Sequence, residues 1–180
     1  MKNKIPKLLL FVVFLLSTMP VYCGILPYIK EKGRIYFLIG QEAGGNDKYK
    51  WSDFSGKPKK RETPKQTAAR EAAEETGYVF GGKGFWAGKI KNKPGKYFFV
   101  ANISQEVRKL GGRGAVLAKL RKKRGGGEIM NYLWITKNQL CNPGKIPKMR
   151  NRGSKSKRKY KVKFRDFLFT RRNKLANMAK

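Results

Sequence analysis

The sequence predicts an α/β domain that is preceded by a signal peptide and followed by a basic C-terminal extension. Apolar, β-branched runs typical of strands alternate with helical segments. The first residues combine a basic start with a short apolar run, and acidic residues almost disappear after Cys141. We therefore divide the 180 residues into a leader at 1–23, one folded domain at 24–140 and an extension at 141–180.

The leader contains three lysines in its first seven residues and then nine uninterrupted apolar residues, 8–16. Such a run is too short to cross about 30 Å of hydrocarbon as a helix, and Pro20 stops it from continuing. We expect a signal peptide that is cleaved after Cys23 and a secreted or periplasmic product. An uncleaved N-terminal membrane anchor is the alternative.

The composition excludes several classes of catalytic site. The chain has 43 Lys and Arg against 11 Asp and Glu, a net charge of +32, yet 40% of its residues are hydrophobic. This indicates a folded core with a basic surface rather than a disordered tail. No histidine is present, which excludes Ser-His-Asp catalysis and His-containing metal sites. The two cysteines, Cys23 and Cys141, exclude a disulfide framework and a thiolate zinc site.

The domain opens with a predicted hairpin and a well-marked helix. Runs 24–30 and 34–40 read as two strands, and a third strand covers 50–54. The helix, 64–76, has the strongest end signals in the chain. They are a capping hydroxyl at Thr63, Pro64 at the first helical position, Gln66 to complete a capping box, and Gly77 for a left-handed end.

The remaining elements are weaker predictions. Strands are expected at 78–80, 85–91, 97–103 and 129–135, the last with Tyr132 and Trp134 on one face. A short basic helix at 115–124 lies between glycine clusters in what we expect to be a flexible insert. Thr136 starts another helical turn, a mobile linker reaches about 159, and 162–178 docks as a terminal helix. Core positions are expected for the strand aromatics Trp51, Phe85, Trp86, Phe98, Phe99, Tyr132 and Trp134.

Carboxylates are concentrated on the predicted helix. Four of the eleven acidic residues fall between positions 62 and 75: Glu62, Glu71, Glu74 and Glu75. The last three are spaced i, i+3 and i+4, so their side chains share one helix face and repel one another. Arg70 can offset part of this repulsion. Hard divalent cations bind oxygen ligands in such clusters, so the pattern favours a metal site.

These residues complete a longer motif. Gly56, five residues, Glu62, seven residues and then Arg-Glu-Ala-Ala-Glu-Glu-Thr-Gly-Tyr at 70–78 resemble the Nudix box, G-x5-E-x7-R-E-U-x-E-E-x-G-U, in which U is bulky and apolar. All seven fixed residues match at the right spacing. The departures are Ala72, which is small at a U position, and Tyr78, which is aromatic where an aliphatic residue is commoner. Neither changes a candidate ligand.

The resemblance implies a fold, an activity and roles for the box residues. It implies an α/β/α sandwich with a mixed sheet, and Mg²⁺- or Mn²⁺-dependent hydrolysis of a nucleoside diphosphate linked to another moiety. Glu71, Glu74 and Glu75 would be metal ligands, and Glu74 would be essential for turnover. Arg70 would pair with a box carboxylate, Glu62 would make an outer contact to the metal, and Gly56 would permit the turn over the helix start.

The catalytic base and the role of the basic segments stay open. In many family members the base is a glutamate of the box, and in others it is a glutamate on a loop before a late strand, where this chain has Glu128. The alternative for Glu128 is a solvated loop acid. The basic segments 108–127 and 145–165 could bind RNA or an anionic surface. The competing function is therefore a secreted nucleic-acid-binding module on a Nudix scaffold, or a hydrolase of RNA 5′ ends. The sequence identifies neither the substrate nor the oligomeric state.

Overall fold

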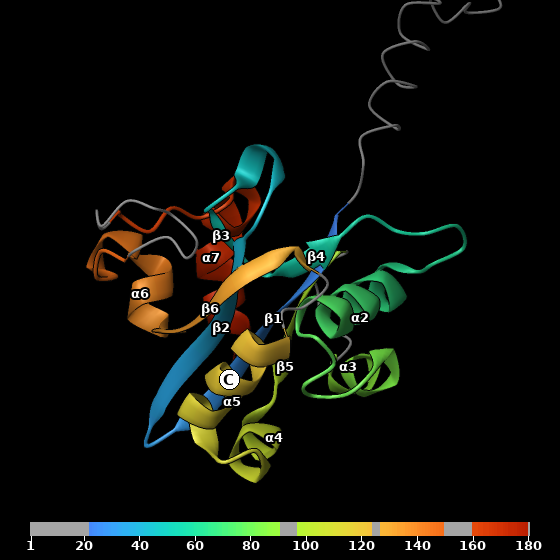
Figure 1. The fold of residues 1–180 in the computed structure, drawn as a ribbon, viewed down its shortest axis with the longest axis horizontal. Helices are drawn as coiled ribbons and strands as arrows, with labels where there is room; N and C mark the ends of the chain where they lie inside the picture. The colour runs from blue at the N-terminus through green and yellow to red at the C-terminus, as the bar shows by residue number, and fades with distance from the viewer. Residues whose placement is uncertain (1–21, 91–96, 124–126, 150–159, 180) are drawn as a thin grey trace, which may run out of the picture.

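The computed structural model describes residues 22–90, 97–123, 127–149 and 160–179 as a mixed sheet with helices on both faces (Figure 1). Within these ranges, no helix combines the length and apolarity needed to cross a membrane. The cleavage point expected after Cys23 falls at the start of the first strand, where the Cys23 side chain is buried. Residues 1–21 of the expected leader lie outside the described residues.

Six strands form the sheet. Their bounds are β1 Cys23–Glu31, β2 Arg34–Glu42, β3 Trp51–Ser52, β4 Phe54–Gly56, β5 Phe98–Asn102 and β6 Ile129–Thr136. β1 and β2 form the predicted antiparallel hairpin, whose tight turn places Lys32 and Gly33 at positive φ. β5 runs parallel to β1, and β6 runs antiparallel to β2. The sheet is therefore mixed, as expected.

The hairpin opens toward its far end, and a short segment fills the gap. β2 pairs with β1 at Arg34–Phe37 but with β3 at Gly40 and Gln41. β1 likewise changes its partner on that edge from β2 to β4. The segment from β3 to β4 thus lies between the two hairpin strands, and it ends at Gly56 beside the start of β1. This placement brings the first residue of the motif against the sheet.

Helices cover both faces of the sheet (Figure 1). The bounds are α2 Pro64–Glu75, α3 Lys83–Lys89, α4 Ser104–Lys109 and α5 Gly112–Lys123 on the first face, and α6 Lys137–Cys141 and α7 Asp166–Met178 on the second. Side chains of β1 point alternately to the two faces of the sheet. Ile25 and Ile29 belong to the core cluster on the first face, and Leu26 belongs to the cluster on the second face. Short 3-10 turns occupy Gly45–Asp47 and Pro143–Lys145.

The end signals of α2 are confirmed in full. Thr63 accepts a hydrogen bond from the Gln66 backbone N–H, and the Gln66 side chain accepts one from the Thr63 N–H, which completes the capping box. Gly77 takes a left-handed conformation at φ 56°, and the Tyr78 N–H donates to the Ala73 carbonyl across the helix end. The same capping box recurs at Thr136, where α6 starts as predicted.

Two predicted strands are wrong. Residues 78–80 form turns, and most of 85–91 lies in α3 or just after it, with 91 outside the described residues. The reason is tertiary packing: the fully buried Trp86 ring meets Phe80 edge-on at 5.6 Å between centroids, beside α2. A helical turn delivers one large anchor to this site, and Gly81 at φ 124° supplies the bend before it. Trp86 is a core residue as expected, but on a helix.

The expected flexible insert and mobile linker are also corrected. Residues 104–123 form α4 and α5, which pack on the core through Val107, Val116 and Leu120. The basic helix predicted at 115–124 therefore starts earlier, at Gly112, and 124–126 are outside the described residues. The first part of the expected linker instead contains the turn Pro143–Lys145 and the buried Ile146, which belongs to the second core cluster, and 150–159 lie outside the described residues. The terminal helix docks as predicted, with Leu168 and Leu175 buried.

Candidate metal centre

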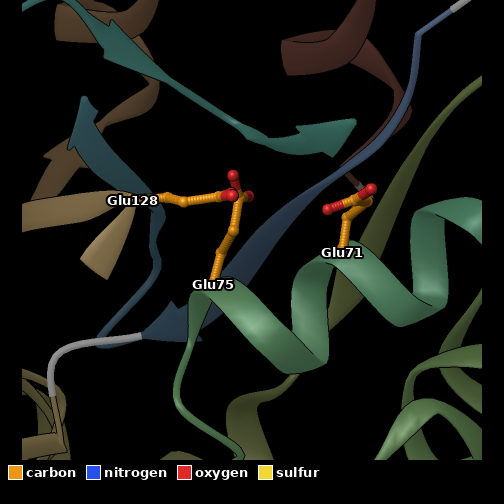
Figure 2. A group of neighbouring side chains, drawn as sticks. All are labelled: Glu71, Glu75 and Glu128. Atoms are coloured by element: carbon orange, nitrogen blue, oxygen red, sulfur yellow. The ribbon is translucent and has the colours of Figure 1, made fainter. Parts of the chain in front are cut away.

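The buried side of α2 carries two carboxylates one turn apart. Glu71 and Glu75 are both buried, although their spacing places like charges on the same helix face. Figure 2 shows both side chains rising from α2 toward the same side, while Glu128 reaches toward Glu75 from the residue before β6. Oxygen atoms of the three side chains all lie within 4.8 Å of one another. Two positions distant in sequence thus form one acidic group, which we call the carboxylate trio.

β4 fixes the positions of the two helix carboxylates. The Ser55 backbone N–H donates to Glu75 Oε2 at 2.9 Å. Glu71 occupies the space beside Gly56, because a Cβ on that glycine would overlap the Glu71 carboxylate. Tyr132 on β6 adds a third tie, since its hydroxyl donates to the Glu75 carbonyl at 2.6 Å. The glycine of the motif is therefore required by the closeness of Glu71 and not by the expected turn, because Gly56 ends β4 without a positive φ.

Arg70 forms hydrogen bonds with three carboxylates of the motif. Its Nε and Nη2 atoms donate to the two oxygens of Glu62 at 2.8 and 3.0 Å. Its Nη1 atom donates to Glu71 Oε1 at 2.7 Å and to Glu74 Oε2 at 3.0 Å. These bonds hold the pKa of Glu62 down at about 2, well below its ordinary value. The expected pairing of Arg70 with box carboxylates is present, and it involves three of them.

Glu74 lies at the edge of the group. It is bonded to Arg70, and Lys59 Nζ lies 3.6 Å from its Oε1 atom. Its side chain is 37% exposed, whereas those of Glu71 and Arg70 are each 11% exposed. Glu62 also lies outside the trio, where it caps the loop through the Lys59 N–H and Thr67 hydroxyl. The structure thus brings Glu71, Glu75 and Glu128 together. Glu62 and Glu74 lie outside this group and are hydrogen-bonded to Arg70.

Buried negative charge accumulates around Glu75, whereas Glu71 is paired with Arg70. Burial raises the pKa of Glu75 well above its ordinary value, and the negative charges of Glu42, Glu71, Asp53 and Glu128 add to the effect. Burial also raises the pKa of Glu71, although Arg70 opposes the shift. A divalent cation would offset this accumulation of negative charge. Carboxylate oxygens are the donors that Mg²⁺ and Mn²⁺ prefer, so the donor set fits such an ion.

Two further acids near the trio were not predicted from the sequence. Asp53 is buried between the hairpin strands, its Oδ2 atom has no hydrogen-bond partner among the described residues, and burial raises its pKa to about 7. Glu42 ends β2 and pairs with Arg165 at 3.1 Å. An acid between the apolar residues Trp51 and Phe54 was the available signal for Asp53. The place of Glu42 depends on the pairing of β2 with β6 and had no local signal.

The comparison with family models identifies one family. The family model described as a NUDIX domain matches residues 20–158. No curated protein sequence matches the chain. Among solved structures, the chain is similar to an Ap4A hydrolase from C. elegans, with 16% identity, 67% of this chain and 82% of that chain covered, and a TM-score of 0.46. The chain is also similar to the NUDIX domain of Shewanella oneidensis NrtR, complexed with ADP ribose. The sequence identity is 12%, the match covers 77% of this chain and 81% of that chain, and the TM-score is 0.46.

Proposed function

The chain belongs to the NUDIX family of pyrophosphohydrolases, and from this premise we propose that it cleaves the diphosphate bond of a nucleoside diphosphate linked to another moiety. The cofactor in this proposal is Mg²⁺ or Mn²⁺. The observation that carries the proposal is the carboxylate trio, whose oxygens lie within 4.8 Å of one another in a protein with a net charge of +32. A group of carboxylates repels a diphosphate unless a cation lies between them.

The trio and its supports define roles for the proposed reaction. Glu71 and Glu75 would hold the cation from α2, in positions fixed by Arg70 and the Ser55 N–H. The cation, when bound, neutralises charge on the bridged phosphates and makes a nearby water more acidic. Glu74, at the exposed edge, remains a predicted ligand, and Glu62 acts through Arg70.

Glu128 is the member of the trio that solvent reaches. Its side chain is exposed, whereas Glu71 and Glu75 are buried, and its backbone carbonyl is tied to the Ala43 N–H at 2.8 Å. We assign it as the base that accepts a proton at a carboxylate oxygen as water attacks phosphorus. The water oxygen forms the new P–O bond, the bridging P–O bond breaks, and the departing phosphate keeps the electron pair.

The test is a hydrolysis screen of the purified protein with Mn²⁺, Mg²⁺ or EDTA. The compounds are dinucleoside polyphosphates, nucleotide sugars, ADP-ribose, nucleoside triphosphates and 5′-triphosphorylated RNA. We expect metal-dependent release of phosphate or a nucleoside monophosphate from at least one of them. Glu75→Gln and Glu74→Gln should abolish turnover with the fold intact. Glu31→Gln, an equal charge change in a half-buried pair with Arg113, should not.

The competing function is a binding module without turnover. It predicts oligonucleotide binding with no hydrolysis of any of these compounds at any metal concentration. Turnover that is unchanged by both Glu75→Gln and Glu74→Gln would show that the reaction centre lies elsewhere.

We also propose that residues 1–23 direct export. The support is the sequence pattern of the leader alone. Expression of the full chain with a C-terminal tag, followed by N-terminal sequencing of the exported product, should give a new terminus near Gly24. A product that starts at Met1 and stays in the membrane fraction would instead support an uncleaved anchor.

A further inference from the structure

A second feature of the first face is a basic hollow beside the end of α2. Its lining is Tyr78, Val79, Leu110, Lys119, Lys122 and Lys123, and its volume is about 530 Å³. We call it the α5 hollow, because all three of its lysines come from that helix. Figure 1 shows α5 in yellow beside α4, and α2 in green ends on the same face. None of its lining residues belongs to the carboxylate trio.

The lysines of the hollow are available to a ligand. Lys119, Lys122 and Lys123 are all exposed, and within the described parts of the chain no carboxylate forms an ion pair with them. By contrast, Lys50, Lys89 and other basic side chains of the domain do have acidic partners. Helical spacing explains the grouping, because residues i, i+3 and i+4 share one face. The helix therefore presents three positive charges together to the solvent.

Tyr78 supplies an aromatic ring at the same place. It is 56% exposed, and its backbone is left-handed at φ 57° directly after Gly77. The other aromatic residues around the end of α2, such as Phe80, are buried in the core. The exposed Tyr78 ring therefore presents a flat apolar surface beside the ammonium groups of the three lysines. Bases stack on such a ring while lysines contact the adjacent phosphates.

We propose that the α5 hollow binds single-stranded nucleic acid. Three lysines match the spaced charges of a phosphate backbone, and a tyrosine face accepts any base, so the pairing is complementary in both charge and shape. A volume of about 530 Å³ is in the range of sites that enclose part of a small ligand or a nucleotide. A stiff duplex hides the faces of its bases, so the ring favours a single strand.

An anionic membrane fits the hollow less well. Binding to a lipid surface uses apolar side chains that insert below the headgroups. Among the described residues, the exposed large hydrophobic side chains are Tyr78, Tyr160 and Phe169, and Tyr78 alone lines the hollow. The site is also concave, whereas a bilayer is flat on this scale.

The hollow lies near the candidate metal centre along both of its walls. Tyr78 follows Glu75 by three residues, and Lys123 precedes Glu128 by five. At no more than about 3.8 Å per residue, these separations are at most roughly 11 Å and 19 Å between Cα atoms. The binding proposal itself does not depend on hydrolysis, and its test excludes metal.

The test measures the anisotropy of fluorescent ten-nucleotide RNA and DNA single strands in EDTA. Replacing Lys119, Lys122 and Lys123 with Ala should weaken binding about tenfold or more at 150 mM salt and reduce the slope of log K against log salt by about 2. The matched control replaces Lys145, Lys148 and Lys174, exposed lysines outside the hollow, and should change affinity by less than about threefold.

Substitutions of Tyr78 separate stacking from charge. Tyr78→Phe keeps the ring and should retain affinity, whereas Tyr78→Asn should weaken single-strand binding about tenfold with an unchanged salt slope. Asn is chosen because it tolerates a left-handed backbone, so the variant should melt at the wild-type temperature. Hydrolysis assays of these variants on a mononucleotide substrate report separately on the proposed reaction.

Several results would overturn the proposal. Equal affinity for single strands and duplex with no effect of Tyr78→Asn would show mere attraction by net charge. Equal losses from the hollow and control lysine variants would show the same. Preferential binding to phosphatidylserine vesicles, with no measurable single-strand affinity, would assign the surface to membranes instead. A preference for RNA over DNA, or the reverse, would refine the proposal while supporting it.

Discussion

Gly56 has no space for a side chain in the candidate site. The Glu71 carboxylate lies where a Cβ would be, so any side chain must displace it or push β4 away from α2. We expect Gly56→Ala to weaken Mn²⁺ binding and to lower the free energy of unfolding, because a buried carboxylate loses its position. Gly44→Ala is the matched control, because nothing lies within 4 Å of its added Cβ. Equal Mn²⁺ affinity of wild type and Gly56→Ala in a calorimetric titration would contradict this account.

Glu62 makes stability depend on pH in a defined direction. Its pKa is lowered from 4.5 to about 2 by its bonds to Arg70, so the folded state favours the charged form. The resulting stabilisation is present above pH 4.5 and is lost as the pH falls through about 2. We expect the difference in unfolding free energy between wild type and Glu62→Gln to be largest near pH 6 and to shrink toward pH 3. Urea titrations at a series of pH values measure it, and a difference that grows on acidification would contradict the assignment.

The box residues could be predicted from the sequence, but their grouping could not. Spacing alone put Glu71 and Glu75 on one helix face, and motif position marked Arg70 as the partner of a box carboxylate. The membership of Glu128 in the trio depends on how β6 pairs with β2, which no local pattern encodes. Glu42 escaped prediction for the same reason. Asp53 had a local signal, its place between Trp51 and Phe54, but its effect on Glu75 depends on the opening of the β1–β2 hairpin.

At the scale of elements, α2 organises the site because its ends are strongly specified. The Thr63 hydroxyl satisfies the Gln66 N–H at the start of the helix, next to the Glu62 pair with Arg70. We expect Thr63→Ala to reduce the free energy of unfolding by about 1 kcal/mol, whereas Thr63→Ser, which keeps the hydroxyl, should change it little. Thermal and urea unfolding report both values. If the Ala and Ser variants have the same stability, the cap contributes nothing.

Helices with explicit end signals were predicted well, and elements set by packing were not. α2 and α6 each begin with a capping box, a pattern of a threonine followed three residues later by a glutamine that is visible in the sequence. α3 was mistaken for a strand because Phe85 and Trp86 favour strands locally, while the buried place of Trp86 beside Phe80 decides the conformation. α4 is six residues long with no side-chain cap, so its formation depends on Val107 in the core.

For the whole molecule, the distribution of charge is the central fact. Only 11 acids oppose 43 basic residues, yet Glu42, Asp53, Glu71, Glu75 and Glu128 act together on one buried region. A basic surface attracts anionic substrates from solution, and an acidic centre requires a cation before it can accept them. The two features together are consistent with a metal-dependent enzyme that acts on phosphorylated compounds.

The most direct test of this account is a Mn²⁺ titration followed by electron paramagnetic resonance, which reports bound metal independently of turnover. The account predicts saturable binding by the wild-type protein, loss of binding in Glu71→Gln and Glu75→Gln, and normal binding in Glu31→Gln. Retention of wild-type Mn²⁺ affinity by Glu75→Gln, or no binding by a correctly folded wild-type protein, would contradict the assignment of the carboxylate trio as the metal centre.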